Sequence, residues 1–252
     1  MGRLKETTFK EFTPRPSLRD YVDGIWYSKT DTPHTLHILP TTRSTLMTCT
    51  TPYGHGVVLV GALSTTQVVD LEQGNVKVGA WLKPGAYYLF SPYKPLELRD
   101  AVVMGRDMGQ TIIRLETAIE RKKTPHEKLE CLQDFIEQLV HEEKIARHAL
   151  VDSFVDRARE DDGRSSVKAI TQDLPIGYRQ SLRLIKHYTG FTAKEFLRLQ
   201  RFTAAAHSLD ATERSITTVA AAHTYADHSH FTREFRSRIG VTPSAFNKYQ
   251  AL

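Results

Sequence analysis

The fold of this chain is decided by the stretch Ser215-Ile-Thr-Thr-Val-Ala-Ala-Ala-His-Thr-Tyr-Ala-Asp-His-Ser-His-Phe-Thr-Arg-Glu-Phe-Arg-Ser-Arg-Ile-Gly-Val-Thr-Pro243. Ile216, Val219 and Ala220 lie at i, i+3 and i+4, the spacing of one buried face of a short helix. A three-residue break follows, and Asp227 then stands where a second helix needs its N-cap. The pattern predicts two helices joined by a tight turn.

The second of these helices is predicted to be apolar on one side only. Phe231, Phe235 and Ile239 repeat every four residues and form its buried face. An apolar back with a front of Arg, His, Ser and Thr suits a helix that enters the major groove of DNA. The residues expected to read base edges are His228, Ser229, His230 and Arg233. Those expected at phosphate, a thymine methyl group or solvent are Thr232, Arg236 and Arg238.

Two runs in this stretch, Tyr225-Ala-Asp-His-Ser-His-Phe-Thr-Arg-Glu-Phe and Gly240-Val-Thr-Pro-Ser, resemble the signature of the AraC/XylS family of bacterial transcription regulators. The resemblance continues upstream through Leu182-Arg-Leu-Ile-Lys and Thr189-Gly-Phe-Thr-Ala-Lys-Glu-Phe-Leu-Arg-Leu-Gln-Arg-Phe202, which look like the family's first helix-turn-helix and its linker helix. It covers about residues 150–252. It implies an all-α C-terminal domain with two helix-turn-helix motifs, which bind double-stranded DNA.

The resemblance also implies the residues of a first recognition helix, at about 178–188. Those expected to face DNA are Arg179, Leu182, Arg183 and Lys186. A linker helix at about 193–209 would place the two recognition helices in successive major grooves, about 34 Å apart. One departure matters here: Ser181 replaces a buried Leu, and Leu182 occupies a usually polar position. Either this helix is rotated by one residue, or the first unit reads DNA loosely and contributes mainly phosphate affinity.

The second unit departs from the family pattern at its turn. Thr224 replaces the glycine-type turn residue, as Pro175 does in the first unit. His223 stands where an apolar residue normally packs. Either this histidine is a satisfied core residue, or it is half-buried and titrates near neutral pH.

The charge of the chain is unevenly distributed. The net charge of the 252 residues is +5, but residues 164–252 carry +7 and residues 1–163 carry −2. A basic C-terminal part behind a near-neutral N-terminal part is the electrostatic footprint of a DNA-binding module joined to another domain. The alternative is ordinary solvated surface charge.

Residues 9–110 are predicted to be mostly strand, because short β-branched or apolar runs are punctuated by Gly, Pro, Asn and Asp. The runs are 36–39, 45–50, 57–60, 67–71 and 76–82. Their rhythm indicates a small β-barrel or sandwich, cupin-like in architecture. Val78-Gly-Ala-Trp-Leu-Lys-Pro-Gly-Ala, Glu97-Leu-Arg-Asp and Phe12-Thr-Pro-Arg-Pro-Ser-Leu-Arg-Asp-Tyr resemble a sensor domain that precedes AraC-type motifs in some regulators. In the family such domains bind a small effector, dimerise, or both.

The N-terminal half offers weak candidates for an effector site: Trp26, Arg43, Trp81 and Tyr88. Large aromatic residues suit a planar or apolar ligand and Arg43 an anionic one; the alternatives are core packing and surface exposure. His34 and His37 are three residues apart on a strand and point to opposite faces, unlike cupin metal ligands. No catalytic motif, metal site or cofactor site is predicted, and the chain is expected not to be an enzyme.

Residues 111–160 are predicted to be helical. Leu129, Leu132, Phe135, Ile136, Leu139 and Val140 form an apolar stripe. Thr124-Pro-His-Glu127 resembles a helix start. The stripe serves either a homodimer through residues 126–140 or packing within the domain. A further helix at 145–158 would open the DNA-binding domain, so the expected domains are 1–142 and 143–252.

These features together predict a sequence-specific transcription regulator whose N-terminal half senses a small molecule. The family resemblance implies an activator that contacts RNA polymerase. The alternative is a regulator whose N-terminal half is a protein-interaction or dimerisation module without an effector. Because the chain has no apolar run of membrane-spanning length and no signal-like N-terminus, it is expected to be cytoplasmic and without a membrane partner.

Overall fold

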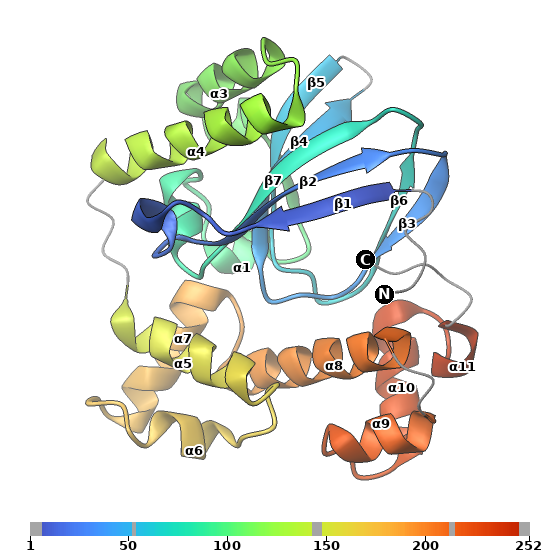
Figure 1. Ribbon diagram of the computed structural model, residues 1–252. Coiled ribbons are helices and arrows are strands. Elements are labelled where there is room, and N and C mark those ends of the chain that lie inside the picture. Colours follow the sequence, from blue (N-terminus) through green and yellow to red (C-terminus); the bar gives the residue numbers. More distant parts are fainter. Residues whose placement is uncertain (1–6, 52–53, 143–147, 212–214, 247–252) are drawn as a thin grey trace.

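The computed structural model describes residues 7–51, 54–142, 148–211 and 215–246. The N-terminal half is a sheet with helices over one face, and the C-terminal half is a layer of helices along one end of it (Figure 1). The expected β-rich first half and helical second half are confirmed. The boundary expected after residue 142 adjoins 143–147, outside the described residues.

Antiparallel pairing joins six strands into one sheet in the order β1-β2-β7-β4-β5-β8, while β3 and β6 form a separate two-stranded ribbon. The strands are β1 (Thr7–Phe12), β2 (Val22–Thr30), β3 (His34–Ile38), β4 (Ser44–Thr51), β5 (Gly54–Val60), β6 (Gln67–Leu71), β7 (Val76–Leu82) and β8 (Val102–Met104). The five expected strands are present. β1, β2 and β8 were not expected, because β1 is largely polar, Asp-Gly interrupts the start of β2, and β8 is short.

Closure of the sheet into a barrel is not part of this pairing. Among the described strands β1 pairs only with β2, and β8 only with β5, so both are sheet edges. The β-rich character of this half is therefore confirmed, while its barrel or sandwich closure stays a prediction.

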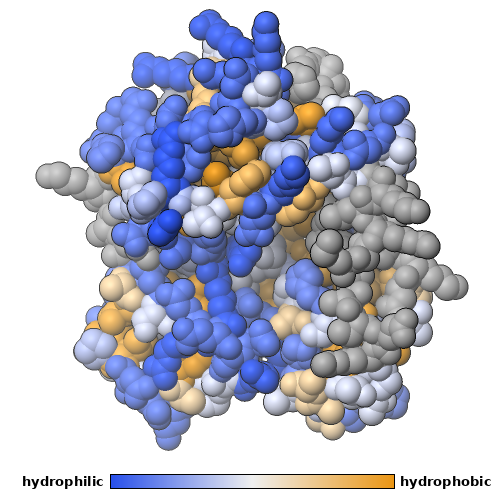
Figure 2. All heavy atoms as spheres, viewed as in Figure 1, coloured by the Kyte–Doolittle hydropathy of each residue, from blue (hydrophilic) through white to orange (hydrophobic). Residues whose placement is uncertain are grey.

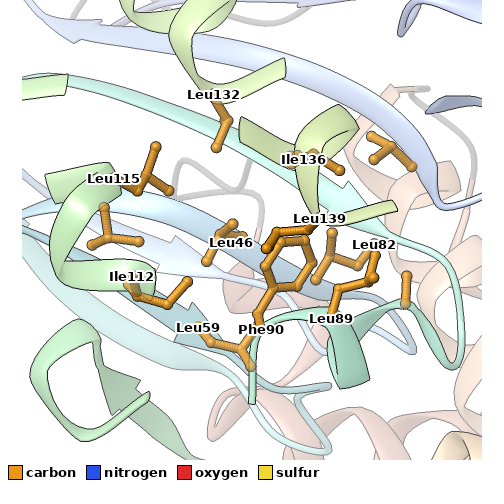
Figure 3. Packing of buried hydrophobic residues seen from close by; sticks show 14 of the residues in the cluster. Leu46, Leu59, Leu82, Leu89, Phe90, Ile112, Leu115, Leu132, Ile136 and Leu139 are labelled. Carbon is orange, nitrogen blue, oxygen red and sulfur yellow. The ribbon is translucent and has the colours of Figure 1, made fainter. Parts of the chain in front are cut away.

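Helices α3 (Gln110–Glu120) and α4 (Pro125–Glu142) cover one face of the sheet (Figures 1 and 3). The apolar stripe of α4 is used there: Leu132 and Ile136 are fully buried in one core with the sheet residues Leu46 and Leu59. Each such side chain contributes about 1.5–3 kcal/mol by leaving water. Most of the stripe is therefore occupied by packing within the N-terminal half.

The expected start of α4 is confirmed by its hydrogen bonds. The hydroxyl of Thr124 accepts from the backbone N–H of Glu127 at 3.2 Å, and the carboxylate of Glu127 accepts from the N–H of Thr124 at 2.9 Å. This reciprocal pair is a capping box. Its charge-assisted bonds lower the pKa of Glu127.

Shorter helical segments connect the strands, and the described residues of the C-terminal half form seven helices. The short segments are η1 (Pro16–Leu18), η2 (Ala86–Leu89), α1 (Pro95–Leu98) and α2 (Gly105–Met108). The C-terminal helices are α5 (Ala149–Glu160), α6 (Val167–Thr171), α7 (Tyr178–Thr189), α8 (Ala193–Ala211), α9 (Ile216–Ala222), α10 (His228–Ile239) and α11 (Pro243–Phe246). The expected helices at 145–158, 178–188 and 193–209 correspond to α5, α7 and α8.

The C-terminal half has two separate cores, and α8 contributes to both. Phe196 from its first half packs with Phe154 of α5 and with residues of α6 and α7. Phe202 from its second half packs with Phe235 of α10 and with residues of α9 and α11. Each short helix pair, α6–α7 and α9–α10, therefore rests on its own part of one continuous helix.

The two halves of the chain are joined by polar contacts. Asp23 on β2 and Arg159 on α5 form a two-point ion pair, with nitrogen–oxygen distances of 2.7 and 3.0 Å, and the Asp23 side chain is 10% exposed. Leu39 of the N-terminal half belongs to the core around Phe202. Paired, hydrogen-bonded charges and a shared apolar contact stabilise one arrangement of the halves.

The turn between α9 and α10 contains a strained residue. Thr224 has a φ of +56°, in the left-handed region that disfavours β-branched side chains. Its side chain is exposed, so removing it costs little packing.

We expect Thr224→Gly to raise the free energy of unfolding by about 1 kcal/mol, because glycine adopts positive φ without strain. Thr217→Gly, at an exposed site within α9, is the matched control and should lower it by about 0.5 kcal/mol. Urea unfolding of both variants measures the two effects. Equal destabilisation by both would contradict the strained turn.

Candidate DNA-binding surface

Helix α10 is positioned by its N-cap and its apolar back. The carboxylate of Asp227 accepts from the backbone N–H of His230 at 2.7 Å, which lowers the pKa of Asp227 and confirms the expected N-cap. Phe231 and Phe235 are fully buried, and Gly240 ends the helix at a φ of +88°. The front of α10 is thereby turned away from the core.

The residues of α10 that are expected to contact DNA differ in how exposed they are to solvent. His228, Ser229, Arg233 and Arg236 are exposed, whereas His230 and Thr232 are half-buried. The His230 ring packs edge-on against Tyr225, 5.4 Å between centroids. Its ring therefore has a partner within the protein, unlike the exposed arginines.

Helix α7 presents a second basic face. Arg179, Arg183 and Lys186 are exposed, as expected, while Leu182 is half-buried against the core around Phe196. Ser181 is 1% exposed, and its hydroxyl donates to the carbonyl of Gly177 at 3.3 Å. Ser181 thus takes the inward position, so the helix is not rotated by one residue.

The basic side chains on these two faces differ from other arginines of the C-terminal half. Within the described chain, no hydrogen bond or ion pair is formed by the side chains of Arg179, Arg183, Lys186, Arg233 and Arg236. In contrast, Arg157 pairs with Asp173 at 2.9 Å. Free, exposed guanidinium groups on two helices are available to phosphates and guanine edges.

Arg238 is placed differently from the expectation that it touches phosphate or solvent, and that expectation is wrong. Its side chain is 17% exposed, and its Nε donates to Glu234 at 2.8 Å. Glu234 is buried and also accepts from Arg198 at 2.9 Å. Periodicity along α10 missed this contact, although the i, i+4 spacing of Glu234 and Arg238 signalled the pair.

His223 is a buried histidine with one ring partner. It is 7% exposed, and its Nε2 lies 2.9 Å from the Ser208 hydroxyl, while no described group reaches its Nδ1. Burial lowers the pKa of His223, since the charged ring would be poorly solvated. The neutral core histidine is therefore the form that the fold stabilises.

Three of the four effector-site candidates lie together on the sheet. The rings of Trp26 and Trp81 are 6.3 Å apart, Phe9 lies 5.7 Å from Trp26, and the Arg43 guanidinium lies 5.1 Å over Trp81. Burial lowers the pKa of Arg43, which also faces Asp23 at 3.7 Å. Arg43 is thus half-buried and engaged, and not a free surface residue. Trp26 Nε1 is buried without a hydrogen-bond partner among the described residues.

Tyr88 lies elsewhere, where η2 meets α7. Its hydroxyl is 3.4 Å from Nε2 of His187, and its ring packs edge-on against Tyr188. Tyr88 therefore joins the two halves of the chain and does not belong with Trp26 and Trp81.

A groove of about 270 Å³ runs between α3 and α4. Its apolar lining includes Leu115, Phe135 and Leu139, and its rim includes Arg114 and Asp134. None of the four candidates lines this groove. Across the described ranges, no group of three or more His, Cys, Asp or Glu residues is arranged to hold a metal, and no helix is long and apolar enough to cross a bilayer.

Hydrophilic side chains dominate the face of the molecule in Figure 2, including the junction between the sheet and the helical layer. This agrees with the ion pair of Asp23 and Arg159 and with the other polar contacts between the halves.

Comparison with known proteins divides the chain in the same way. Residues 170–249 match a helix-turn-helix domain family, and residues 10–104 match a domain of unknown function (DUF6597). No curated protein matches the chain.

Among solved structures, the C-terminal part is similar to an AraC-type regulator from Chromobacterium violaceum, with 22% identity, a TM-score of 0.38, and coverage of 40% of this chain and 90% of that one. The DNA-binding domain of AdpA, solved with a target DNA, is 21% identical with a TM-score of 0.37. The match covers 39% of this chain and 89% of that one. ToxT from Vibrio cholerae gives 12% identity and a TM-score of 0.46 over 97% of this chain and 98% of that one. The first of these structures is described as a transcriptional regulator and the second as a global transcriptional factor.

The lowered pKa of His223 predicts a pH-dependent stability. Below about pH 6.5 the unfolded chain binds a proton that the folded chain excludes, so the free energy of unfolding falls as the pH drops. In His223→Leu, the free energy of unfolding should decrease less than in the wild type as the pH drops from about 7.5 to about 5.5. Urea unfolding at several pH values measures this difference. His126→Gln, at an exposed position, is the control and should keep the pH dependence of the wild type. If His223→Leu shows the same dependence of the free energy of unfolding on pH as the wild type, the prediction is contradicted.

Proposed function

We propose that the C-terminal part of this chain is an AraC-type helix-turn-helix domain and that the whole chain is a sequence-specific DNA-binding transcription regulator. In this proposal, α6–α7 and α9–α10 are two helix-turn-helix units within a DNA-binding domain of residues 143–252. Their second helices, α7 and α10, read the DNA.

One observation carries the proposal: both reading helices present exposed basic side chains that have no partner within the described chain. Arg183 on α7 and Arg233 on α10 are the central members of these faces. Since α8 supports both units, one chain can place both helices on one side of a duplex, about 34 Å or one helical turn apart. An asymmetric site with two elements then needs no dimer.

For α10 we propose that Arg233 pairs with guanine, with His228 and Ser229 beside it. His230 and Thr232 are half-buried, so we propose that they contact the DNA only with their exposed atoms. Arg236 contacts phosphate. On α7 we propose that Arg183 reads a base while Arg179 and Lys186 hold phosphate. Leu182, half-buried against the core, reaches DNA only with its exposed edge.

For residues 1–142 we propose a sensor domain that binds a small effector. The support is the cluster of Phe9, Trp26, Trp81 and Arg43, which brings together aromatic rings, a cation and a buried indole N–H without a partner, groups that suit a planar anionic ligand. The regulator is proposed to be a cytoplasmic activator that contacts RNA polymerase. Quenching of tryptophan fluorescence by planar organic acids tests the effector site, with Trp81→Phe as the variant that weakens it.

The second candidate makes the N-terminal half a protein-interaction or dimerisation module without an effector. The groove between α3 and α4 favours it, because residues 126–140 expose there the part of their apolar stripe that the sheet leaves uncovered. Sedimentation of the full chain separates the candidates: a dimer weakened by Phe135→Glu, together with no quenching by any ligand, supports the second.

Arg233→Ala should relax base preference at one element and weaken binding to the selected site by about 1–3 kcal/mol. The measurement is selection of bound sequences from random duplexes with the full chain, followed by titration of the selected site. Arg236→Ala is the matched control on the same helix and should weaken all sequences alike, because a phosphate contact carries no base preference. An unchanged consensus in Arg233→Ala would contradict the assignment of α10.

Arg183→Ala tests whether the first unit reads bases. If it does, the variant loses base preference at the DNA element that α7 contacts and keeps the preference at the element that Arg233 contacts. If instead binding weakens evenly and its salt dependence becomes shallower by about one counterion, α7 supplies phosphate affinity only. The two outcomes decide between the two roles proposed for this helix.

A further inference from the structure

The last turn of α10 is bonded to the N-terminal half of the chain. Nη1 of Arg238 donates to the carbonyl of Ser64 at 2.9 Å, and the backbone N–H of Thr66 donates to the carbonyl of Arg238 at 2.8 Å. The last four carbonyls of a helix lack partners within the helix, so Thr66 supplies a bond that the helix itself cannot make. Two hydrogen bonds in opposite directions thus join α10 to the segment between β5 and β6.

The side chain of Arg238 is held at several points. Its Nε donates to Glu234, which also pairs with Arg198 on α8, and its guanidinium lies 5.4 Å over the ring of Phe202. One planar group therefore links α10 to α8 and to Ser64 at the same time. A lysine could not reproduce this, because its single ammonium lacks the fixed fork of donors.

The Ser64 segment is itself anchored within the N-terminal half. The carboxylate of Asp100 accepts from the Ser64 N–H at 2.5 Å and from the Ser64 hydroxyl at 2.6 Å. Leu63 and Thr41 exchange backbone bonds of 2.9 Å. At Gly61 a Cβ atom would lie 1.6 Å from the carbonyl oxygen of Leu98, so this close approach requires glycine. The segment is a rigid acceptor for Arg238.

The other reading helix also ends against the N-terminal half. At the end of α7, the carbonyl of Tyr188 accepts from the hydroxyl of Tyr87 at 3.5 Å, and a Cβ at Gly190 would lie 2.7 Å from the carbonyl oxygen of Pro95. Arg99, next to Asp100, pairs with Glu195 near the start of α8 at 3.4 Å. The N-terminal half therefore contacts α7, α8 and α10.

We infer that Arg238 is a positioning residue, through which the N-terminal half sets the orientation of α10 relative to α7 and thereby the spacing of the two DNA elements. This inference rests on the proposed function. Adjacent base pairs are about 3.4 Å apart along the duplex, so a small displacement of α10 moves its contacts into another register. The bonds of Arg238 to Ser64 and Glu234 oppose such a displacement.

The test uses the full chain and a set of duplexes that carry the two selected elements at several spacings. The wild type should prefer one spacing. Arg238→Ala should read the same two elements but discriminate between spacings about tenfold less, which corresponds to the loss of one hydrogen bond from a charged donor. Arg238→Lys should behave like Arg238→Ala, whereas a phosphate contact would be retained by lysine.

Two further variants make the result decisive. Asp100 has a φ of +57°, which glycine adopts freely, so Asp100→Gly releases Ser64 without straining the fold and should also loosen the spacing preference. Arg121→Ala removes an exposed charge at the end of α3 and should keep the wild-type preference.

An unchanged spacing preference in both Arg238→Ala and Asp100→Gly overturns the inference and leaves the proposed function intact. A uniform loss of affinity in Arg238→Ala that lysine restores also overturns it, because Arg238 then acts on the phosphate backbone. A wild-type chain that selects no consensus contradicts the proposed function itself.

Discussion

The structure of the C-terminal half depends on one constraint, which is that a single helix must complete two cores. Phe196 and Phe202 lie six positions apart on α8 and are both fully buried, each in the core that a different helix pair shares with α8. Because neither pair buries its apolar faces without α8, the two basic faces are carried on one rigid element. The proposed recognition of two elements by one chain depends on that shared support.

The N-terminal half adds a second support through polar contacts. Asp23 with Arg159, Arg99 with Glu195, and Ser64 with Arg238 are all charge-assisted bonds. Such bonds depend strongly on geometry, unlike apolar contacts, so the junction favours one arrangement but releases it at modest cost. A regulator needs this combination, since a ligand or a partner that binds the N-terminal half can then bias the reading helices.

Sequence periodicity predicted those parts of the fold whose burial is local. The four-residue repeat of Phe231 and Phe235 and the N-cap Asp227 placed α10 correctly, since each depends on neighbours within one helix. It failed where partners come from remote segments. The stripe of α4 was ambiguous because a sheet and a second helix bury it equally well, and Arg238 looked free because Ser64 is distant along the chain. Exposure agrees with the residues expected to face DNA, but their contacts stay a prediction because they depend on the DNA itself.

The central claim is that α7 and α10 of one chain occupy successive major grooves on one side of a duplex. Hydroxyl-radical footprinting of the full chain on its selected site tests this most directly. We expect two protected patches on each strand, centred about ten base pairs apart and facing the same side. A single patch, or two patches on opposite sides of the duplex, would contradict it.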